Sequence, residues 1–123
     1  MLAGRIIAES LVVGADLNVP SLRLTRITRE DVSGASTPRQ PDVFTLLDVE
    51  AEEEDAYALA EALAAALEDG PGWYADFRVG DERVVVFPGR IFRYPAGDAA
   101  GRNAAVEHGR ALGIPENQLD WGG

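Results

Sequence analysis

Few residues of this chain are of a type that could carry catalysis or bind a metal ion. Its 123 residues include one histidine, His108, and no cysteine. Thiolate nucleophiles, iron–sulfur clusters, disulfides and cysteine-based or multi-histidine zinc sites are therefore excluded. No phosphate-binding glycine loop, H-E-x-x-H helix, G-x-S-x-G turn or EF-hand loop occurs. We expect no cofactor, no metal and no catalytic residue, and the sequence favours a protein that is not an enzyme.

The single histidine lies on a face of small residues in a predicted helix over 98–112. Gly101, Ala105 and Gly109 recur there every four residues, which lets a helix approach a sheet closely. An imidazole at such a contact must find hydrogen-bond partners or lose stability. We therefore expect His108 to be mostly buried and bonded to backbone or to a carboxyl group.

Acidic residues are concentrated in the middle of the chain. Residues 1–47 hold five acids and five arginines, residues 48–82 hold twelve acids and one arginine, and residues 83–123 hold four acids and five arginines. The resulting net charge of -10 disfavours nucleic acid and anionic membranes as partners. The run 48–55 lacks the turn glycine of a calcium loop. It is either a solvated helix start, which suits the helix dipole, or a docking surface for a basic protein.

A second group of polar residues shares one side of a predicted strand over 73–79. Tyr74, Asp76 and Arg78 alternate there with apolar residues, and Arg93 follows on a later strand. This side is an ordinary solvated face, a protein interface, or a shallow ligand site with Asp76 as acid or base and Arg78 or Arg93 holding an anion. The predicted partner-binding residues are Glu52, Glu53, Glu54, Asp55, Tyr74, Asp76, Arg78 and Arg93.

The elements that must position these residues follow from hydrophobic periodicity and turn residues. The helix predicted over 55–68 places Leu59, Leu63 and Leu67 on one buried side and leaves Tyr57, Glu61 and Glu68 exposed. Strands are predicted over 5–13, 21–29, 43–50, 73–79, 83–87 and 90–94. The order βββαβββα predicts one α+β domain over 1–123, a two-layer sandwich with a mainly antiparallel sheet and two helices on one face.

No targeting segment is apparent in the sequence. Arg5 and Glu9 interrupt the apolar N-terminal run, and no apolar stretch approaches the ~20 residues of a membrane span. We expect a soluble, cytoplasmic protein that does not bind membranes.

The basic residues indicate a source. All eleven are arginine, which is typical of a high-GC genome. The segments Trp73–Phe77, Val85–Gly89, Phe92–Pro95 and Gly113–Trp121 resemble a group of small uncharacterised proteins of high-GC actinobacteria and their phages. This resemblance implies a bacterial or phage origin and no particular function.

Together these patterns predict a small acidic module that acts by protein–protein contact. An inhibitor, an immunity or anti-defence factor, or a subunit of an assembly would fit, with a basic protein as partner and homo-oligomers left open. The alternative is a small enzyme or ligand-binding protein that uses the open sheet face around Asp76 and Arg78.

Overall fold

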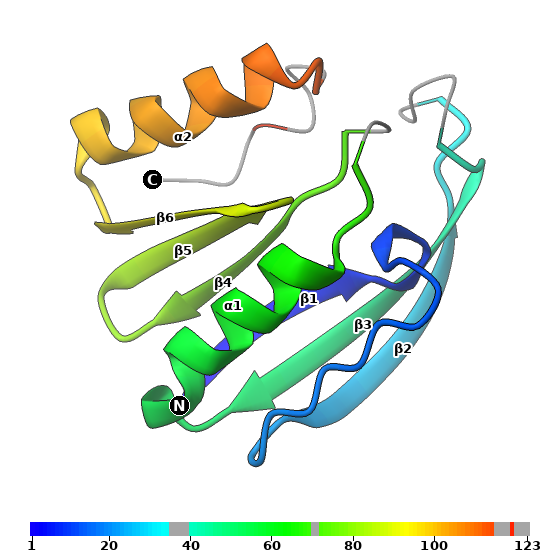
Figure 1. The fold of residues 1–123 in the computed structure, drawn as a ribbon, viewed down its shortest axis with the longest axis horizontal. Helices are drawn as coiled ribbons and strands as arrows, with labels where there is room; N and C mark the ends of the chain where they lie inside the picture. The colour runs from blue at the N-terminus through cyan, green and yellow to red at the C-terminus, as the bar shows by residue number, and fades with distance from the viewer. Residues whose placement is uncertain (35–39, 70–71, 115–118, 120–123) are drawn as a thin grey trace.

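The computed structural model describes residues 1–34, 40–69, 72–114 and 119, and six strands form one open sheet (Figure 1). The strands are β1 (Leu2–Ile7), β2 (Arg23–Asp31), β3 (Val43–Ala51), β4 (Ala75–Val79), β5 (Glu82–Phe87) and β6 (Arg90–Pro95). The helices are α1 (Ala56–Ala66) and α2 (Ala99–Ala111), and short 3-10 turns cover Ala8–Ser10 and Glu53–Asp55. The predicted α+β class and the order of the elements are confirmed.

The sheet order is β2-β3-β1-β4-β5-β6, and every neighbouring pair is antiparallel. Because β3 and β4 both run antiparallel to β1, they are parallel to each other and need a crossover, which α1 provides. The strands β4, β5 and β6 instead form a meander with tight turns. Gly80 and Gly89 take positive φ angles of 56° and 70° in these turns. No helix among the described residues has the length and apolarity needed to cross a membrane.

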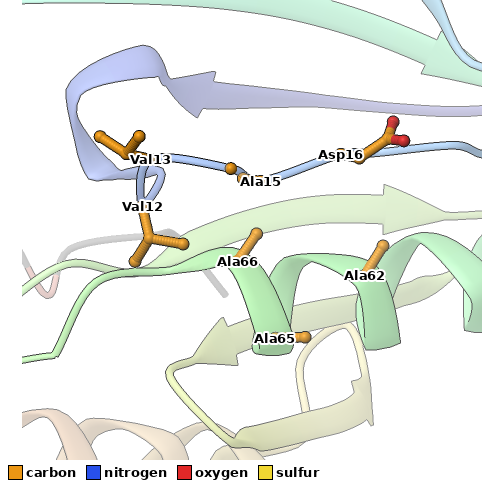
Figure 2. A pocket seen from close by; sticks show the side chains of 8 residues that line it. Val12, Val13, Ala15, Asp16, Ala62, Ala65 and Ala66 are labelled. Atoms are coloured by element: carbon orange, nitrogen blue, oxygen red, sulfur yellow. The ribbon is translucent and has the colours of Figure 1, made fainter.

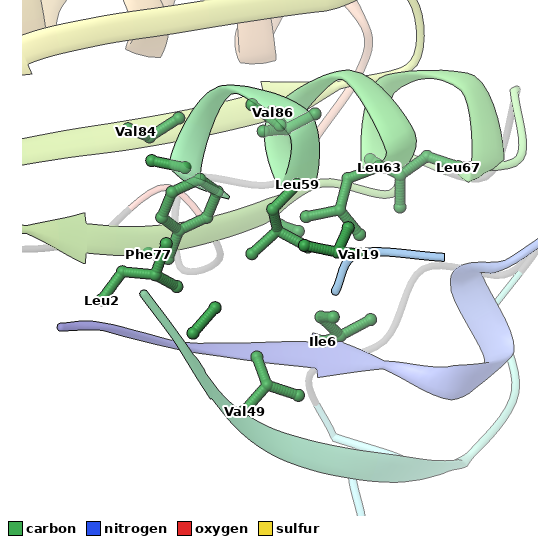
Figure 3. Packing of buried hydrophobic residues seen from close by; sticks show 14 of the residues in the cluster. Leu2, Ile6, Val19, Val49, Leu59, Leu63, Leu67, Phe77, Val84 and Val86 are labelled. Carbon is green, nitrogen blue, oxygen red and sulfur yellow. The ribbon is translucent and has the colours of Figure 1, made fainter. Parts of the chain in front are cut away.

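Helix α1 covers one face of the sheet with the leucines that the periodicity predicted. Leu59, Leu63 and Leu67 are 1–4% exposed, whereas Tyr57, Glu61 and Glu68 are exposed, so this prediction is confirmed. Figure 3 shows the leucine side chains directed toward Val19 and the strands below, including Ile6 of β1. The segment between β1 and β2 therefore completes this apolar layer beside the helix.

Helix α2 lies on the opposite face of the sheet, which differs from the expectation of two helices on one face. Alternate residues of a strand point to opposite faces. In β5, Val84 and Val86 pack in the cluster that contains α1, whereas Val85 and Phe87 pack in the cluster that contains Ala105 and Val106 of α2. The β5 end of the sheet is thus covered on both sides, and the unbroken apolar run of β5 reflects this double burial.

The first strand is shorter than the predicted 5–13. It ends at Ile7, where the Oγ of Ser10 donates a hydrogen bond to the Ile7 carbonyl within a 3-10 turn. The side chain of Glu9 accepts bonds from the backbone N–H of Thr45 at 2.6 Å and from its hydroxyl at 2.7 Å. These three bonds, one local and two to Thr45 of β3, divert the chain from the ladder although its β-branched residues favour a strand.

Candidate binding face

Neither helix covers one side of the central strands. Asp76 and Arg78 of β4 alternate with Ala75, Phe77 and Val79, which pack against the α1 layer, so their side chains lie on the opposite side. Helix α2 packs over β5 and β6 and does not extend over β1. We call this side of β3, β1 and β4 the open face.

A row of alternating charges crosses the open face. Arg26 of β2 is registered with Asp48 of β3, Asp48 with Arg5 of β1, and Arg5 with Asp76 of β4. Arg5 Nε donates to Asp48 Oδ1 at 2.7 Å, and this hydrogen bond lowers the pKa of the Asp48 carboxyl group. Opposite charges that face each other across strands stabilise a sheet, so this row has a structural role.

The neighbouring row contains a like-charged pair. Arg78 of β4 lies directly opposite Arg83 of β5, an arrangement that destabilises a sheet. Arg83 Nη1 donates to Asp76 Oδ2 at 3.1 Å, but its buried Nε makes no hydrogen bond within the described part of the chain. Arg78 is exposed and makes no ion pair with any described residue. Of these two guanidinium groups, only that of Arg83 is paired with a carboxylate among the described residues.

These residues surround a shallow hollow of about 290 Å³ on the open face. Its lining includes the charged groups Arg5, Asp48, Asp76, Arg78 and Arg83. Three guanidinium groups against two carboxylates give the hollow an excess positive charge, although the whole chain is acidic. Such a site suits a group that brings a negative charge and accepts several hydrogen bonds, for instance a carboxylate.

Asp76 is the titratable group of the hollow whose surroundings oppose its ionisation. Burial raises its pKa above the ordinary value of 3.8, although the neighbouring charge and hydrogen bond of Arg83 act in the opposite direction. The folded protein thus holds a proton on Asp76 more tightly than the unfolded chain does.

The Asp76 pKa gives a prediction for stability against pH. A group whose pKa is raised by folding stabilises the folded protein when the pH is below the pKa of that group in the unfolded chain. This stabilisation disappears as the pH rises through the pKa of the group in the folded protein. The free energy of unfolding of the wild type should therefore fall relative to that of Asp76→Asn as pH increases from 3 upward. Urea titrations of both proteins from pH 3 to 7 measure this difference, and a difference that moves the other way would contradict the assigned environment.

Of the four partner-binding residues that the sequence predicts on the sheet, the structure places only two next to each other. Asp76 and Arg78 lie side by side in the hollow. Tyr74 instead packs its ring against Phe87 under α2, with centroids 6.0 Å apart. Arg93 is registered with Val84 on the α1 side and pairs with Glu82 at 2.6 Å, so it lies on the other face of the sheet.

The acidic residues before α1 lie at one end of the sheet. Glu52, Glu53 and Glu54 are exposed, and the Glu53 carboxylate accepts a hydrogen bond from the N-terminal ammonium at 3.1 Å. Asp55 accepts hydrogen bonds from the backbone N–H and the hydroxyl of Ser21 and makes no capping bond to α1. Asp55 therefore has a structural role, in holding Ser21 beside the start of α1.

Three charged residues that line the hollow are not among the residues predicted from the sequence: Arg5, Asp48 and Arg83. Arg5 carried a usable signal, because a charged residue within the apolar run of a central strand implies that one face of that strand is uncovered. Asp48 was counted with the acidic run. Arg83 gave no signal, because its position opposite Arg78 depends on the strand register.

The expectation for His108 is corrected. The imidazole is half-buried and makes no hydrogen bond to a described residue. It packs instead against the rings of Phe87 and Phe92, with centroids 4.8 and 5.4 Å away. Burial lowers the pKa of the ring, and the charge of Arg90 lowers it further. Aromatic contacts accommodate the neutral ring, so His108 contributes to packing.

A second hollow of about 300 Å³ lies between α1 and the segment 12–16 (Figure 2). Val12, Val13 and three alanines of α1 line it, with Asp16 as its only charged residue. One carboxylate beside short apolar side chains offers no pair of groups for catalysis or for oriented polar binding. We assign no site to this hollow.

Among the described residues no group of three or more histidine, aspartate or glutamate side chains is arranged to hold a metal ion. Comparisons of the chain with protein-family models, curated proteins and solved structures give no match. The resemblance seen in residues 73–121 remains a prediction, and the candidate function rests on the open face.

Proposed function

We propose that this protein is a protein-binding module whose open face receives its partner. The observation that carries the proposal is Arg78, an exposed arginine on an uncovered sheet face, opposite Arg83 and with no ion pair of its own among the described residues. Like charges placed opposite each other reduce stability, and a carboxylate of a partner protein would compensate for this loss. Arginine is also enriched among residues that dominate binding energy.

The shape of the open face supports a macromolecular partner over a catalytic site. The hollow is shallow, whereas small-molecule sites enclose most of their ligand in a cleft or cavity. The acidic residues Glu52, Glu53 and Glu54 adjoin the open face, because the Glu53 carboxylate lies beside Gly80, two residues from Arg78. A partner that places a carboxylate at Arg78 and basic side chains near Glu52 and Glu54 would match both regions, and those glutamates would accelerate association.

The experiment begins with capture of the partner from cells of the source organism and its purification. The affinity of the partner is then measured for the wild type, for Arg78→Glu and for the control Arg110→Glu, which changes charge equally on the exposed side of α2. We expect Arg78→Glu to weaken binding by about ten-fold or more and Arg110→Glu to leave it nearly unchanged. Equal effects of both variants would contradict the assigned face.

The contribution of Glu52, Glu53 and Glu54 to partner binding can be measured separately, through the association rate. Changing Glu52, Glu53 and Glu54 together to glutamine should slow association by about ten-fold at low salt and much less at high salt, because salt screens exposed charges. Circular dichroism of the triple variant checks that the fold is intact. An association rate that is independent of salt in the wild type would exclude steering by these residues.

A small-anion site is the second candidate, favoured by the raised Asp76 pKa beside three arginines. Inorganic phosphate is a suitable probe, because it accepts bidentate bonds from guanidinium groups. A rise of the melting temperature with millimolar phosphate in the wild type, absent in Arg78→Glu, would support this candidate.

A further inference from the structure

Strand β2 forms an edge of the sheet and is unusually exposed. It pairs with β3 on one side only, and eight of its nine residues are exposed. Two of these are apolar, Leu24 at 51% and Ile27 at 60% exposure. A long edge strand with exposed apolar side chains presents unpaired N–H and C=O groups to any strand that approaches.

The charges of β2 are ordered along the strand. Three arginines occupy its first seven positions, and Glu30 and Asp31 end it. Arginines alone would protect an edge by repelling every second copy. Glu30 and Asp31 alter this balance, because an antiparallel copy brings the basic part of one strand against the acidic part of the other.

The register of β2 makes this complementarity specific. A bulge at Thr25 shifts the alternation, so Arg23, Arg26 and Glu30 point to the same face, as their β3 partners Glu50, Asp48 and Phe44 show. In an antiparallel pair centred on Ile27, Arg23 of each copy then lies opposite Glu30 of the other. Arg26 lies opposite Thr28, and the two Ile27 side chains meet on the two-fold axis. No like charges face each other in this register.

The overall charge of the chain does not oppose this contact. The excess of acidic residues lies in 48–82, whereas residues 1–47, which include β2, contain equal numbers of acids and arginines. We propose that β2 pairs with β2 of a second copy of this chain, so that the two sheets become continuous across a two-fold dimer. An isologous contact of this kind is closed and does not lead to fibres.

Sedimentation velocity of the full chain over a range of concentrations tests the proposal. We expect a monomer–dimer equilibrium that Glu30→Arg weakens by about ten-fold, because it turns two attractive cross-strand pairs into repulsive ones. The control Glu61→Arg, with the same charge change on the exposed side of α1, should dimerise like the wild type. A wild type that is monomeric at all concentrations would overturn the proposal.

A mixing experiment distinguishes strand pairing from a general charge effect. Arg23→Glu should also be mainly monomeric, but an equimolar mixture with Glu30→Arg should form heterodimers. In the mixed pair the introduced glutamate of one chain meets the introduced arginine of the other, and the native Arg23 and Glu30 that remain face each other. Circular dichroism of each variant establishes that it is folded. Failure of the two folded variants to associate would contradict the proposed register.

Discussion

Replacing Leu63 with alanine is expected to lower the free energy of unfolding by about 2–5 kcal/mol. Leu63 is 1% exposed and lies in the middle of the leucine row by which α1 covers the sheet. Its truncation removes buried apolar surface and leaves a cavity, because the surrounding strands relax only partly. Urea unfolding followed by circular dichroism measures the loss.

The control for Leu63→Ala lies on the same helix. Tyr57 is 67% exposed, so Tyr57→Ala should change the free energy of unfolding by at most about 0.5 kcal/mol. A similar small loss for Leu63→Ala would show that α1 does not cover the core as described.

The second large effect is expected from Gly101→Ala, which should destabilise the protein although alanine favours helices. A Cβ atom at this position of α2 would lie 2.4 Å from Tyr94 Cβ and 2.9 Å from Tyr94 Cγ. On an exposed helix the same change stabilises by about 1 kcal/mol. Overpacking against the inflexible base of a buried tyrosine side chain costs about 1–3 kcal/mol, so we expect a net loss.

Gly109→Ala provides a matched comparison on the same face of α2. The nearest atom to a Cβ at this position is Leu119 Cδ2, at 2.5 Å, which is the end of a flexible side chain that can move aside. Its cost should therefore be clearly smaller than that of Gly101→Ala. A higher melting temperature for Gly101→Ala than for Gly109→Ala would contradict the close contact of Gly101 with Tyr94.

The sequence was sufficient to predict most of the elements, because local periodicity determines them, but it did not predict that β1 ends at Ile7. The leucine spacing of α1 and the glycine–alanine spacing of α2 each indicated a buried side of a helix, and burial of Leu59 and Ala105 bears this out. The order of the strands in the sheet could not be predicted from local periodicity, because β1 pairs with β3 and β4 through contacts between residues distant in sequence. The side of the sheet taken by α2 follows from that order and from the double burial of β5.

The candidate site was predictable only within one strand. Alternation in β4 predicts that Asp76 and Arg78 lie on one side of the strand. The structure agrees, because both residues line the hollow. Their neighbours Arg5, Asp48 and Arg83 come from other strands, and only the register brings them together. Arg93 was assigned to this side because its strand was read without the β5–β6 register, which places it opposite Val84 on the α1 side.

Arginine side-chain NMR during titration with the captured partner tests the central claim most directly, because each Nε–Hε signal reports on one guanidinium group. We predict that the signals of Arg5 and Arg78 shift on binding, whereas those of Arg102 and Arg110 on α2 remain in place. Shifts confined to Arg102 and Arg110, with Arg5 and Arg78 unchanged at saturation, would contradict the assignment of the open face as the binding surface.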